Sequence, residues 1–407
     1  MARVLVILPT SSYRTPDFVR AADRLGVELA VASEETPPLE MGDRFVRIDF
    51  SDPAAAAEAI VGLADRSPID AIVAADDAGV VAAALASEAL GLDHHSPAAA
   101  AATRDKLELR TRLAVFEVPQ PHFRAVDPAR PGELARAGRE LGFPLVLKPR
   151  TGSASRGVLR IDDPDDTDAL ATVARIAADL GEEGPLLAEA WLTGSEVALE
   201  GMLVESGLST LAVFDKPDTP TGPTFPETLL VTPSRQPPEV LAELNRVISA
   251  ACAGLGLTHG PIHAEAMIDP SGRVHLLEVA ARSIGGLCSR SLRFGLMGTS
   301  LEELILSVAV GRGRPPARQP GASGVMMLPV TRSGVMAGVD GIDAARAIEG
   351  VVEIDVTIPT GTPVRPLPDG DRYLGFVFAV GRTPDEVVDR LREATAALDV
   401  RIEAETV

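Results

Sequence analysis

The chain has 407 residues, with 38 basic and 58 acidic side chains and a formal net charge of −20. That length predicts two to four structural units with a substantial core. A hydrophobic content of 46% beside 24% charged residues excludes global disorder. The negative charge argues against a nucleic-acid partner, because proteins that bind phosphate backbones carry a basic surface. Two cysteines cannot form a disulfide framework, which fits a reducing compartment.

Nothing in the sequence predicts targeting or membrane insertion. The apolar run at residues 4–8 is too short for the core of a signal peptide and is followed by Pro9. The alanine-rich stretch at 80–90 is interrupted by Ser87 and Glu88, so no run spans a bilayer. We therefore expect a cytoplasmic protein, with neither nucleic acid nor a membrane as partner.

Residues 1–96 alternate strand and helix patterns. Strands are predicted at 4–8, 27–32 and 69–74, and helices at 17–25 and 79–90, each helix closed by a glycine. This succession favours a parallel sheet covered by helices, an N-terminal α/β domain of Rossmann-like type. The first strand-to-helix turn has no glycine fingerprint, so we do not expect it to bind a dinucleotide.

A second segment, residues 97–310, begins where Ser96 precedes Pro97, a typical helix start. The helical pattern reaches residue 116. Beyond it, the pattern predicts two strands within 144–161, strands at 186–190 and 196–203, a helix at 238–255, and a hairpin of 262–268 with 274–280.

Residues 311–316 contain two glycines and two prolines and are typical of a linker. The remainder, within 311–407, predicts a small α+β domain. Its last helix is expected to begin at Pro384, with Thr383 as N-cap and Glu386 completing a capping box.

The sharpest local signal lies at residues 143–158, where an apolar strand ends at Lys148 and is followed by a loop of small residues. Small residues let backbone N–H groups approach phosphate oxygens, and the lysine supplies a nearby point charge. The string is not a Walker A loop, since no Gly-Lys-Ser/Thr opens a helix. A β-hairpin with a polar turn explains it equally well, so both interpretations stay open.

The second signal is the pair Glu265 and Glu278, on strands joined by the turn residues 269–272. A four-residue loop sets a register in which Glu265 faces Leu276 and is a diagonal neighbour of Glu278, roughly 7–8 Å away on one sheet face. Arg282 continues the same face. Two carboxylates among apolar residues suit Mg²⁺ with nucleotide phosphate. The alternative is a solvated face whose charges are ordinary surface residues.

The string from Glu189 to Glu196 is a weaker signal. A strand that runs into a bend could offer backbone groups to an adenine edge, and a carboxylate could accept ribose hydroxyls. A generic strand–turn–strand explains it as well.

Taken in order, these pieces resemble the ATP-grasp superfamily, and within it the L-amino-acid ligase group of carboxylate–amine ligases. The order of five weak motifs is more specific than any single one. The superfamily motifs are Arg104-Asp105-Lys106, Val146-Leu147-Lys148-Pro149, the string from Glu189 to Glu196, His263-Ala264-Glu265 and Leu277-Glu278-Val279-Ala280-Ala281-Arg282. The strings similar to the ligase group are Asp215-Lys216-Pro217, residues 221–227, Gly285-Gly286, residues 371–375 and residues 381–384.

The resemblance implies three domains, with the ATP-grasp domain at 97–310, and a role for each matched position. Lys106 and Lys148 would contact ATP phosphates. The loop residues that would close over them are Ser153, Ala154, Ser155 and Gly157. Adenine would be held by Glu189, Ala190 and Leu192, and ribose by Glu196. Glu265 and Glu278 would bind magnesium, and Arg282 would neutralise the transferring phosphoryl group. The residues assigned to the substrates are Lys216, Glu227, His263, Arg282, Ser283, Gly285 and Gly286.

The implied activity is an ATP- and Mg²⁺-dependent ligase, with Mn²⁺ able to substitute. It would join amino acids or similar substrates into an amide through an acyl phosphate, with Arg282 and Lys148 as catalytic residues, in a homodimer. Many ATP-grasp enzymes carry a further metal ligand, Asn, two residues after the second glutamate, whereas this chain has Ala280. Lys216 fits either a phosphate contact or a lid residue.

Three other functions are compatible with parts of the sequence. A metal-dependent hydrolase could use His259, His263, Glu265 and His275, a local cluster among the six histidines. An ATP-grasp ligase or carboxylase could act on a metabolite other than an amino acid. A third possibility is a nucleotide-binding protein without catalysis. Cys288 lacks a basic partner in the sequence pattern and is expected to be a buried thiol.

Overall fold

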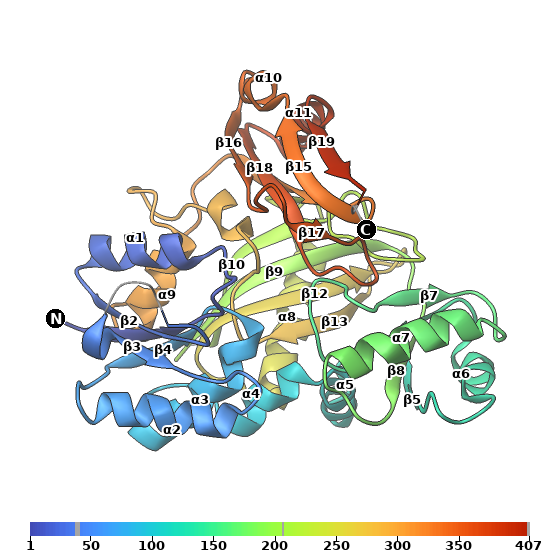
Figure 1. The fold of residues 1–407 in the computed structure, drawn as a ribbon, viewed down its shortest axis with the longest axis horizontal. Coiled ribbons are helices and arrows are strands. Elements are labelled where there is room, and N and C mark those ends of the chain that lie inside the picture. The colour runs from blue at the N-terminus through green and yellow to red at the C-terminus, as the bar shows by residue number, and fades with distance from the viewer. Residues whose placement is uncertain (37–40, 206, 405–407) are drawn as a thin grey trace.

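The computed structural model describes residues 1–36, 41–205 and 207–404, which form three lobes around a central sheet (Figure 1). In the N-terminal lobe, the described strands form a parallel sheet in the order β3-β2-β1-β4, with helices on both faces. The lobe consists of β1 (Arg3–Ile7), α1 (Thr15–Leu25), β2 (Glu28–Ser33), β3 (Phe45–Arg47), α2 (Pro53–Ala64), β4 (Ala71–Ala74) and α3 (Val80–Leu90). The parallel α/β sheet predicted from the sequence is confirmed. Two elements, β3 and α2, were not predicted.

Local chemistry explains the helix ends in this lobe. Asp52 caps α2 by accepting a hydrogen bond from the Ala55 N–H, and α1 and α3 end at Gly26 and Gly91 in left-handed backbone conformations. Two further helices, α4 (Pro97–Arg104) and α5 (Lys106–Val115), follow. They are separate because Asp105 leaves the helical conformation and caps α5.

The lid lobe is a small antiparallel sheet in the order β5-β8-β6-β7, covered by two helices. It consists of β5 (Phe123–Val126), α6 (Glu133–Leu141), β6 (Leu145–Lys148), β7 (Leu159–Ile161), α7 (Thr167–Asp179) and β8 (Leu186–Ala190). Its core is separate from that of the other lobes and contains Leu145, Leu147, Ile161, Val173 and Ala188.

The central sheet has the order β13-β12-β9-β10-β11-β14-β18-β16 among the described strands. Its strands are β9 (Ser195–Val204), β10 (Gly207–Asp215), β11 (Leu229–Thr232), β12 (Gly260–Ile268), β13 (Val274–Ala280), β14 (Ala322–Pro329), β16 (Val351–Val356) and β18 (Tyr373–Gly381). Because β11 pairs with β14, the sheet continues across the linker expected at 311–316. Residues 97–310 and 311–407 thus contribute strands to one sheet.

The remaining elements cover the ends of this sheet. Helix α8 (Pro238–Leu255) packs against β13, and α9 (Leu301–Ala309) packs against α1 and β4 of the N-terminal lobe. The C-terminal lobe, drawn in orange and red in Figure 1, adds β15 (Gly334–Asp340), α10 (Ile342–Arg346), β17 (Pro363–Val364), α11 (Pro384–Ala396) and β19 (Asp399–Glu403). None of the described helices combines the length and the apolar character needed to cross a membrane.

Two sequence expectations are corrected here. The loop between β12 and β13 has five residues, 269–273, rather than the expected four, because Ile268 pairs with Val274, and a bulge between Leu276 and Glu278 shifts the pairing by one more residue. Glu265 therefore lies directly opposite Glu278 rather than diagonal to it. At α11, Thr383 does cap the helix, but the Glu386 carboxylate accepts from the Arg382 N–H instead of the N-cap N–H, so the reciprocal capping box does not form.

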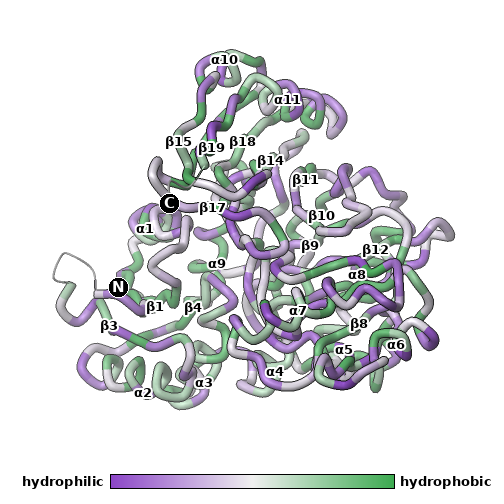
Figure 2. Tube along the Cα trace, turned by 45° about the vertical axis from the view of Figure 1, so that its right-hand side comes forward, coloured by the Kyte–Doolittle hydropathy of each residue, from purple (hydrophilic) through white to green (hydrophobic). Residues whose placement is uncertain are grey.

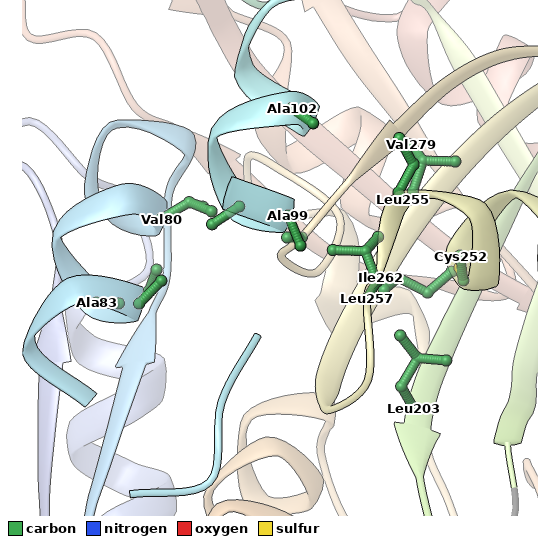
Figure 3. Packing of buried hydrophobic residues seen from close by; sticks show 14 of the residues in the cluster. Val80, Ala83, Ala99, Ala102, Leu203, Cys252, Leu255, Leu257, Ile262 and Val279 are labelled. Carbon is green, nitrogen blue, oxygen red and sulfur yellow. The ribbon is translucent and has the colours of Figure 1, made fainter. Parts of the chain in front are cut away.

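Apolar packing joins the N-terminal lobe to the central sheet. Figure 3 shows Val80 and Ala83 of α3 beside Ala99 of α4, with Ile262 and Leu257 completing the contact from the central domain. Figure 2, in which the chain is coloured by hydropathy, shows hydrophobic strands inside and hydrophilic loops outside. One continuous core thus holds these two lobes in a fixed relation.

Candidate active site

A cavity of about 640 Å³ opens where the lid lobe, the central sheet and the N-terminal lobe meet. Most of the residues assigned to a site from the sequence line it. They are Lys106, Lys148, Ser153, Ala154, Ser155, Glu189, Ala190, Leu192, Glu196, Glu227, His263, Glu265, Glu278, Arg282, Gly285 and Gly286. Gly157, Lys216 and Ser283 do not line it, although Lys216 and Ser283 bond to residues that do.

All three lysines of the chain belong to this site, whereas its other 35 basic residues are arginines. Lys106 and Lys148 line the cavity, and the ammonium group of Lys216 lies between carboxylates at its edge. A lysine ammonium is a compact point charge on a flexible stem, suited to following a phosphate group. The motifs did not indicate that every lysine of the chain lies at this site, although a count of lysines in the sequence shows that there are only three.

Lys148, at the end of β6, forms a buried ion pair with Glu189 of β8. The Lys148 Nζ lies 2.7 Å from Glu189 Oε2, and the Arg110 Nε lies 2.6 Å from Glu189 Oε1. Burial lowers the pKa of Lys148, with the Glu189 charge opposing that change. Burial alone would raise the pKa of Glu189, but Arg110 and Lys148 outweigh it and hold that pKa at about 2. Both oxygens of Glu189 therefore already have cationic partners, which sequence reasoning did not predict.

The loop of residues 149–158 carries the small residues predicted to close over phosphates. Lys106 Nζ donates to the Gly152 carbonyl at 2.8 Å, so α5 and the loop are tied together. Ala154 and Ser155 have φ values of 53° and 57°, in the left-handed region that non-glycine residues rarely adopt. The Gly157 N–H donates to the Pro368 carbonyl at 2.9 Å, which connects the loop to the C-terminal lobe.

Glu265 belongs to two sets of acidic residues, with its facing partner Glu278 on β13 and with Glu196 and Glu227. Glu265 and Glu278 share one sheet face, and carboxylate oxygens of Glu196, Glu227 and Glu265 all lie within 4.8 Å of one another. Lys216 donates to all three members of that cluster, at 2.6 Å to Glu196 and 2.7 Å to Glu265. Carboxylate oxygens are the ligands that Mg²⁺ prefers, so the chemistry of Glu265 and Glu278, the two residues predicted to bind it, suits this metal.

His263 sits between two carboxylates. Its Nδ1 lies 3.1 Å from Glu200 Oε2, and its Nε2 lies 3.6 Å from Glu265 Oε1. Burial disfavours the charged ring, but the two glutamates outweigh it and raise the pKa of His263 to about 9. The buried Glu200 also accepts from the Ile284 N–H at 3.0 Å, so it fixes the segment after Arg282. Glu200 was not predicted as a site residue.

Two arginines connect the cavity to the N-terminal lobe. Arg282 Nη2 donates to Asp77 Oδ2 at 2.7 Å, and Arg104 forms a second ion pair with Asp77 at 3.1 Å. Arg14, which also lines the cavity, donates to the Ser283 hydroxyl at 2.8 Å and pairs with the buried Glu302 at 2.8 Å. Neither Asp77 nor Arg14 was predicted, because both lie far along the chain from the motifs that they support.

The side of the cavity near β8 is lined by Ala190 and Leu192, the residues assigned to adenine. Between them, Trp191 contacts two side chains: the Arg160 guanidinium lies 5.0 Å from its ring centroid, and the Phe225 ring lies 5.8 Å away at a tilt of 34°. Arg160 also donates to the Thr221 carbonyl at 2.8 Å. These contacts hold the loop of residues 216–228, which carries Glu227, against the lid lobe.

The histidines of the alternative hydrolase are not assembled into a metal centre among the residues with described placement. His259 lies beside His95, whose Nδ1 accepts from the His259 backbone N–H at 3.2 Å. His275 pairs with Asp269 at 3.1 Å, whereas His263 faces Glu200. Cys288 is buried, which confirms the expected buried thiol, and burial raises its pKa.

Comparison with known proteins agrees with this geometry. Three family models match in chain order: the ATP-grasp N-terminal domain at 19–94, the ATP-grasp domain at 141–291, and the L-amino acid ligase C-terminal domain 2 at 326–403. The chain is an ATP-grasp protein. Its C-terminal part, residues 326–403, matches the C-terminal domain of the L-amino acid ligases, a group of the superfamily that the chain resembles.

The relatives are of the same kind. Alanine–anticapsin ligase of Bacillus subtilis strain 168 is 27% identical over 274 residues, covering 62% of this chain and 56% of the relative. The match spans 56–60% of the length of the first curated relatives.

Solved structures share the fold. L-amino acid ligase from Bacillus licheniformis superimposes with a TM-score of 0.80 at 22% identity, covering 99% of both chains. The biotin carboxylase domain of Hydrogenobacter thermophilus 2-oxoglutarate carboxylase, in complex with MgADP, ADP and bicarbonate, gives 0.71 at 16% identity, covering 98% of this chain and 90% of that one.

Proposed function

We propose that this protein is an ATP- and Mg²⁺-dependent ligase that joins the carboxylate of one amino acid to the amino group of another. The observation that supports this most directly is the composition of one cavity. Lys106, Lys148 and Arg282 line it together with the facing pair Glu265 and Glu278. Cations for a triphosphate and carboxylates for a divalent ion therefore meet at the same place.

In the proposed first step, an oxygen of the substrate carboxylate attacks the γ-phosphorus of ATP. The bond from that phosphorus to the β,γ-bridging oxygen breaks, and ADP leaves. In the second step, the amine nitrogen attacks the acyl carbon, the bond from carbon to the phosphate oxygen breaks, and the amine loses a proton. Inorganic phosphate departs with one oxygen from the original carboxylate. Each step is a transfer in which charge builds on oxygen, so positioned cations lower its barrier.

The residues of the chain divide this work by position. Lys106 and Lys148 are placed to contact the phosphates, and Arg282, held by Asp77, is placed to neutralise the transferring group. The Gly157 N–H connects the loop of residues 149–158 to the C-terminal lobe. When closed over the phosphates, this loop would keep water from the acyl phosphate.

The metal would be held by Glu265 and Glu278, which share one sheet face, with Glu196 and Glu227 near enough to join them. When bound, Mg²⁺ would screen the negative charge of the phosphates during transfer. The carboxylate set does not distinguish Mg²⁺ from Mn²⁺, so we propose that Mn²⁺ also supports turnover. In this chain Lys216 supplies a positive charge to Glu196, Glu227 and Glu265.

The experiment that tests this function follows oxygen. The protein is incubated with ATP, Mg²⁺ and pairs of amino acids, one of which carries ¹⁸O in its carboxylate. We expect ADP release and one ¹⁸O atom in each inorganic phosphate formed, together with the mass of a dipeptide. The label is placed on each amino acid of the pair in turn, and ADP release with phosphate that lacks ¹⁸O in both experiments would contradict the acyl phosphate. Sedimentation of the purified chain checks the proposed homodimer separately.

A further inference from the structure

The face of the central sheet that forms the cavity floor changes character from one strand to the next. Glu278 of β13 pairs with Glu265 of β12, and Glu265 pairs on its other side with Ala198 of β9. Beyond β10 the same face continues with Leu230 of β11 and Met327 of β14. The acidic end is thus followed by apolar strands within one cavity.

The apolar end of the cavity is built from six residues: Ala198, Leu230, Cys288, Met327, Tyr373 and Phe376. Five of them, all except Tyr373, are almost fully buried. Met327 pairs directly with Phe376 across β14 and β18, and its sulfur lies 3.7 Å from the Cys288 Sγ. Apart from the Tyr373 hydroxyl, no side chain in this set carries an oxygen or nitrogen, so it can satisfy few polar groups.

Gly286 gives this end its shape. The residue has φ 57°, and a Cβ built on it would lie 2.9 Å from the Phe376 Cζ. A side chain here would push into the aromatic ring, whereas glycine leaves the space beside Phe376 open. The segment after Arg282 thus borders the apolar end directly.

Charged groups lie at the edge of the same chamber. Tyr373 is close enough to Glu227 that burial and this carboxylate both raise the Tyr373 pKa. Arg282 and Gly285 line the other edge. An α-amino acid presents an ammonium, a carboxylate and a side chain from one carbon. Glu227, Arg282 and the apolar end offer one complementary surface to each of these groups.

We infer that the amino acid whose carboxylate is activated carries a large apolar side chain, which binds among Met327, Cys288 and Phe376. This inference rests on the proposed function and goes further by naming the substrate class. A methylene in an apolar pocket changes specificity by about 10- to 200-fold. A polar side chain would lose its water there without finding a partner.

The test uses the unmodified protein with ATP, Mg²⁺ and a fixed amine, and compares leucine, methionine, phenylalanine, alanine, asparagine and aspartate as the acid. Leucine and asparagine have nearly the same shape, so this pair separates polarity from size. We expect kcat/KM for ADP release to be about 100-fold higher with leucine than with asparagine, and at least about 10-fold higher than with alanine. Fragment ions of the product, measured by tandem mass spectrometry, show which amino acid supplied the acyl group.

Equal or better turnover with asparagine, aspartate or alanine would overturn the inference while leaving the ligase function standing. If none of the acids supports ADP release, whereas a non-amino-acid carboxylate does, the proposed amino-acid ligase itself fails. Calorimetric titration of leucine and asparagine into the protein with MgADP gives a second readout, because burial of an apolar side chain produces a negative heat-capacity change.

Two substitutions on β14 locate the pocket. Met327→Ala enlarges the chamber, so the ratio of kcat/KM for phenylalanine over leucine should rise about 10-fold. Met326→Ala is the matched control, because Met326 belongs to the hydrophobic core on the opposite face of the sheet. It should lower the unfolding temperature without changing this ratio. An unchanged ratio in Met327→Ala, with the protein folded, would remove Met327 from the pocket. The ratio of kcat/KM for leucine over asparagine is measured on the unmodified protein, so it does not depend on the folding of a variant.

Discussion

Arg282 of the central domain and Asp77 of the N-terminal lobe form a buried ion pair, with Nη2 and Oδ2 2.7 Å apart. Burial alone would raise the pKa of Asp77, but Arg282 and Arg104 outweigh it and hold that pKa far below its usual range. A carboxylate that stays ionised keeps the guanidinium in one orientation. The N-terminal lobe contains no phosphate-binding motif, but its Asp77 positions Arg282, the side chain assigned to phosphoryl transfer.

Asp77→Asn should weaken this positioning while keeping the shape of the site. We expect kcat for ADP release to fall about 10- to 100-fold, because a hydrogen bond to a charged group is worth roughly 1.5–3 kcal/mol. Arg282→Ala should abolish ADP release. Steady-state kinetics at saturating ATP check both variants, and Asp65→Asn, at an exposed helix end, serves as control. Unchanged kcat in Asp77→Asn would show that Arg282 needs no orientation from this lobe.

Variants of Lys148 and Glu189 distinguish the contribution of Lys148 to stability from its contribution to phosphoryl transfer. Lys148→Met leaves Glu189 buried with only Arg110 as charged partner, and we expect a loss of about 1–3 kcal/mol in unfolding free energy together with loss of ADP release. In the double variant Lys148→Met/Glu189→Gln the buried Arg110 loses its carboxylate partner, so stability should fall further while turnover stays absent, as measured by urea denaturation and ADP release. Recovered turnover would contradict a phosphate contact for Lys148.

His263 predicts a loss of stability at alkaline pH. Its folded pKa of about 9 lies above the ordinary value of 6.5, so its protonation stabilises the fold fully below pH 6.5. This contribution, of order 3 kcal/mol, disappears as the pH rises through 9. Unfolding temperatures between pH 6.5 and 9.5 should fall in the native chain and fall less in His263→Gln. His122→Gln, at an exposed position, should keep the native slope.

Two other histidines predict the opposite slope in acid. Burial lowers the pKa of His94 to about 4 and of His95 to about 3, below the ordinary 6.5. Their neutral rings stabilise the fold above pH 6.5, and this contribution is lost as the pH falls toward 3. His95→Gln should flatten the acid limb of the unfolding-temperature profile without affecting the alkaline limb. If His95→Gln changed the alkaline limb, the loss of stability at alkaline pH would belong to a group other than His263.

The three lysines allow a test of nucleotide binding that does not depend on turnover. Reductive dimethylation reaches amines only, so the available targets are Lys106, Lys148, Lys216 and the N-terminal amine. MgATP should protect Lys106 and Lys148, whereas the exposed N-terminal residue should react equally with or without it. Peptide mass spectrometry measures each position. Labelling of Lys106 that MgATP does not change would argue against its phosphate contact.

The sequence predicted most of what is local. The end of α1 at Gly26, the helix α8 and the strands of the β12–β13 hairpin follow from glycine caps and hydrophobic period. The facing glutamates were found although the predicted register was wrong. A loop one residue longer than expected and a bulge together moved Glu278 by two positions, and a bulge leaves no mark in a hydrophobic pattern.

What the sequence could not show are contacts between distant segments. Glu200 lies 63 residues from its partner His263, and Arg14 lies 269 residues from Ser283. Neither sits in a motif, and each bonds to a motif residue only because the sheets and lobes bring them together. The strand pairing of β11 with β14, which carries the central sheet into the C-terminal lobe, is of the same kind.

The only tryptophan of the chain, Trp191, lies between Arg160 of the lid lobe and Phe225 of the loop that carries Glu227. Its indole therefore sits at the joint between the part of the protein that would grip the nucleotide and the part that would grip an amino acid. Rotation of either part changes the surroundings of a single natural fluorophore. Rapid-mixing fluorescence on the unlabelled protein can thus reveal the order in which the two ligands are engaged.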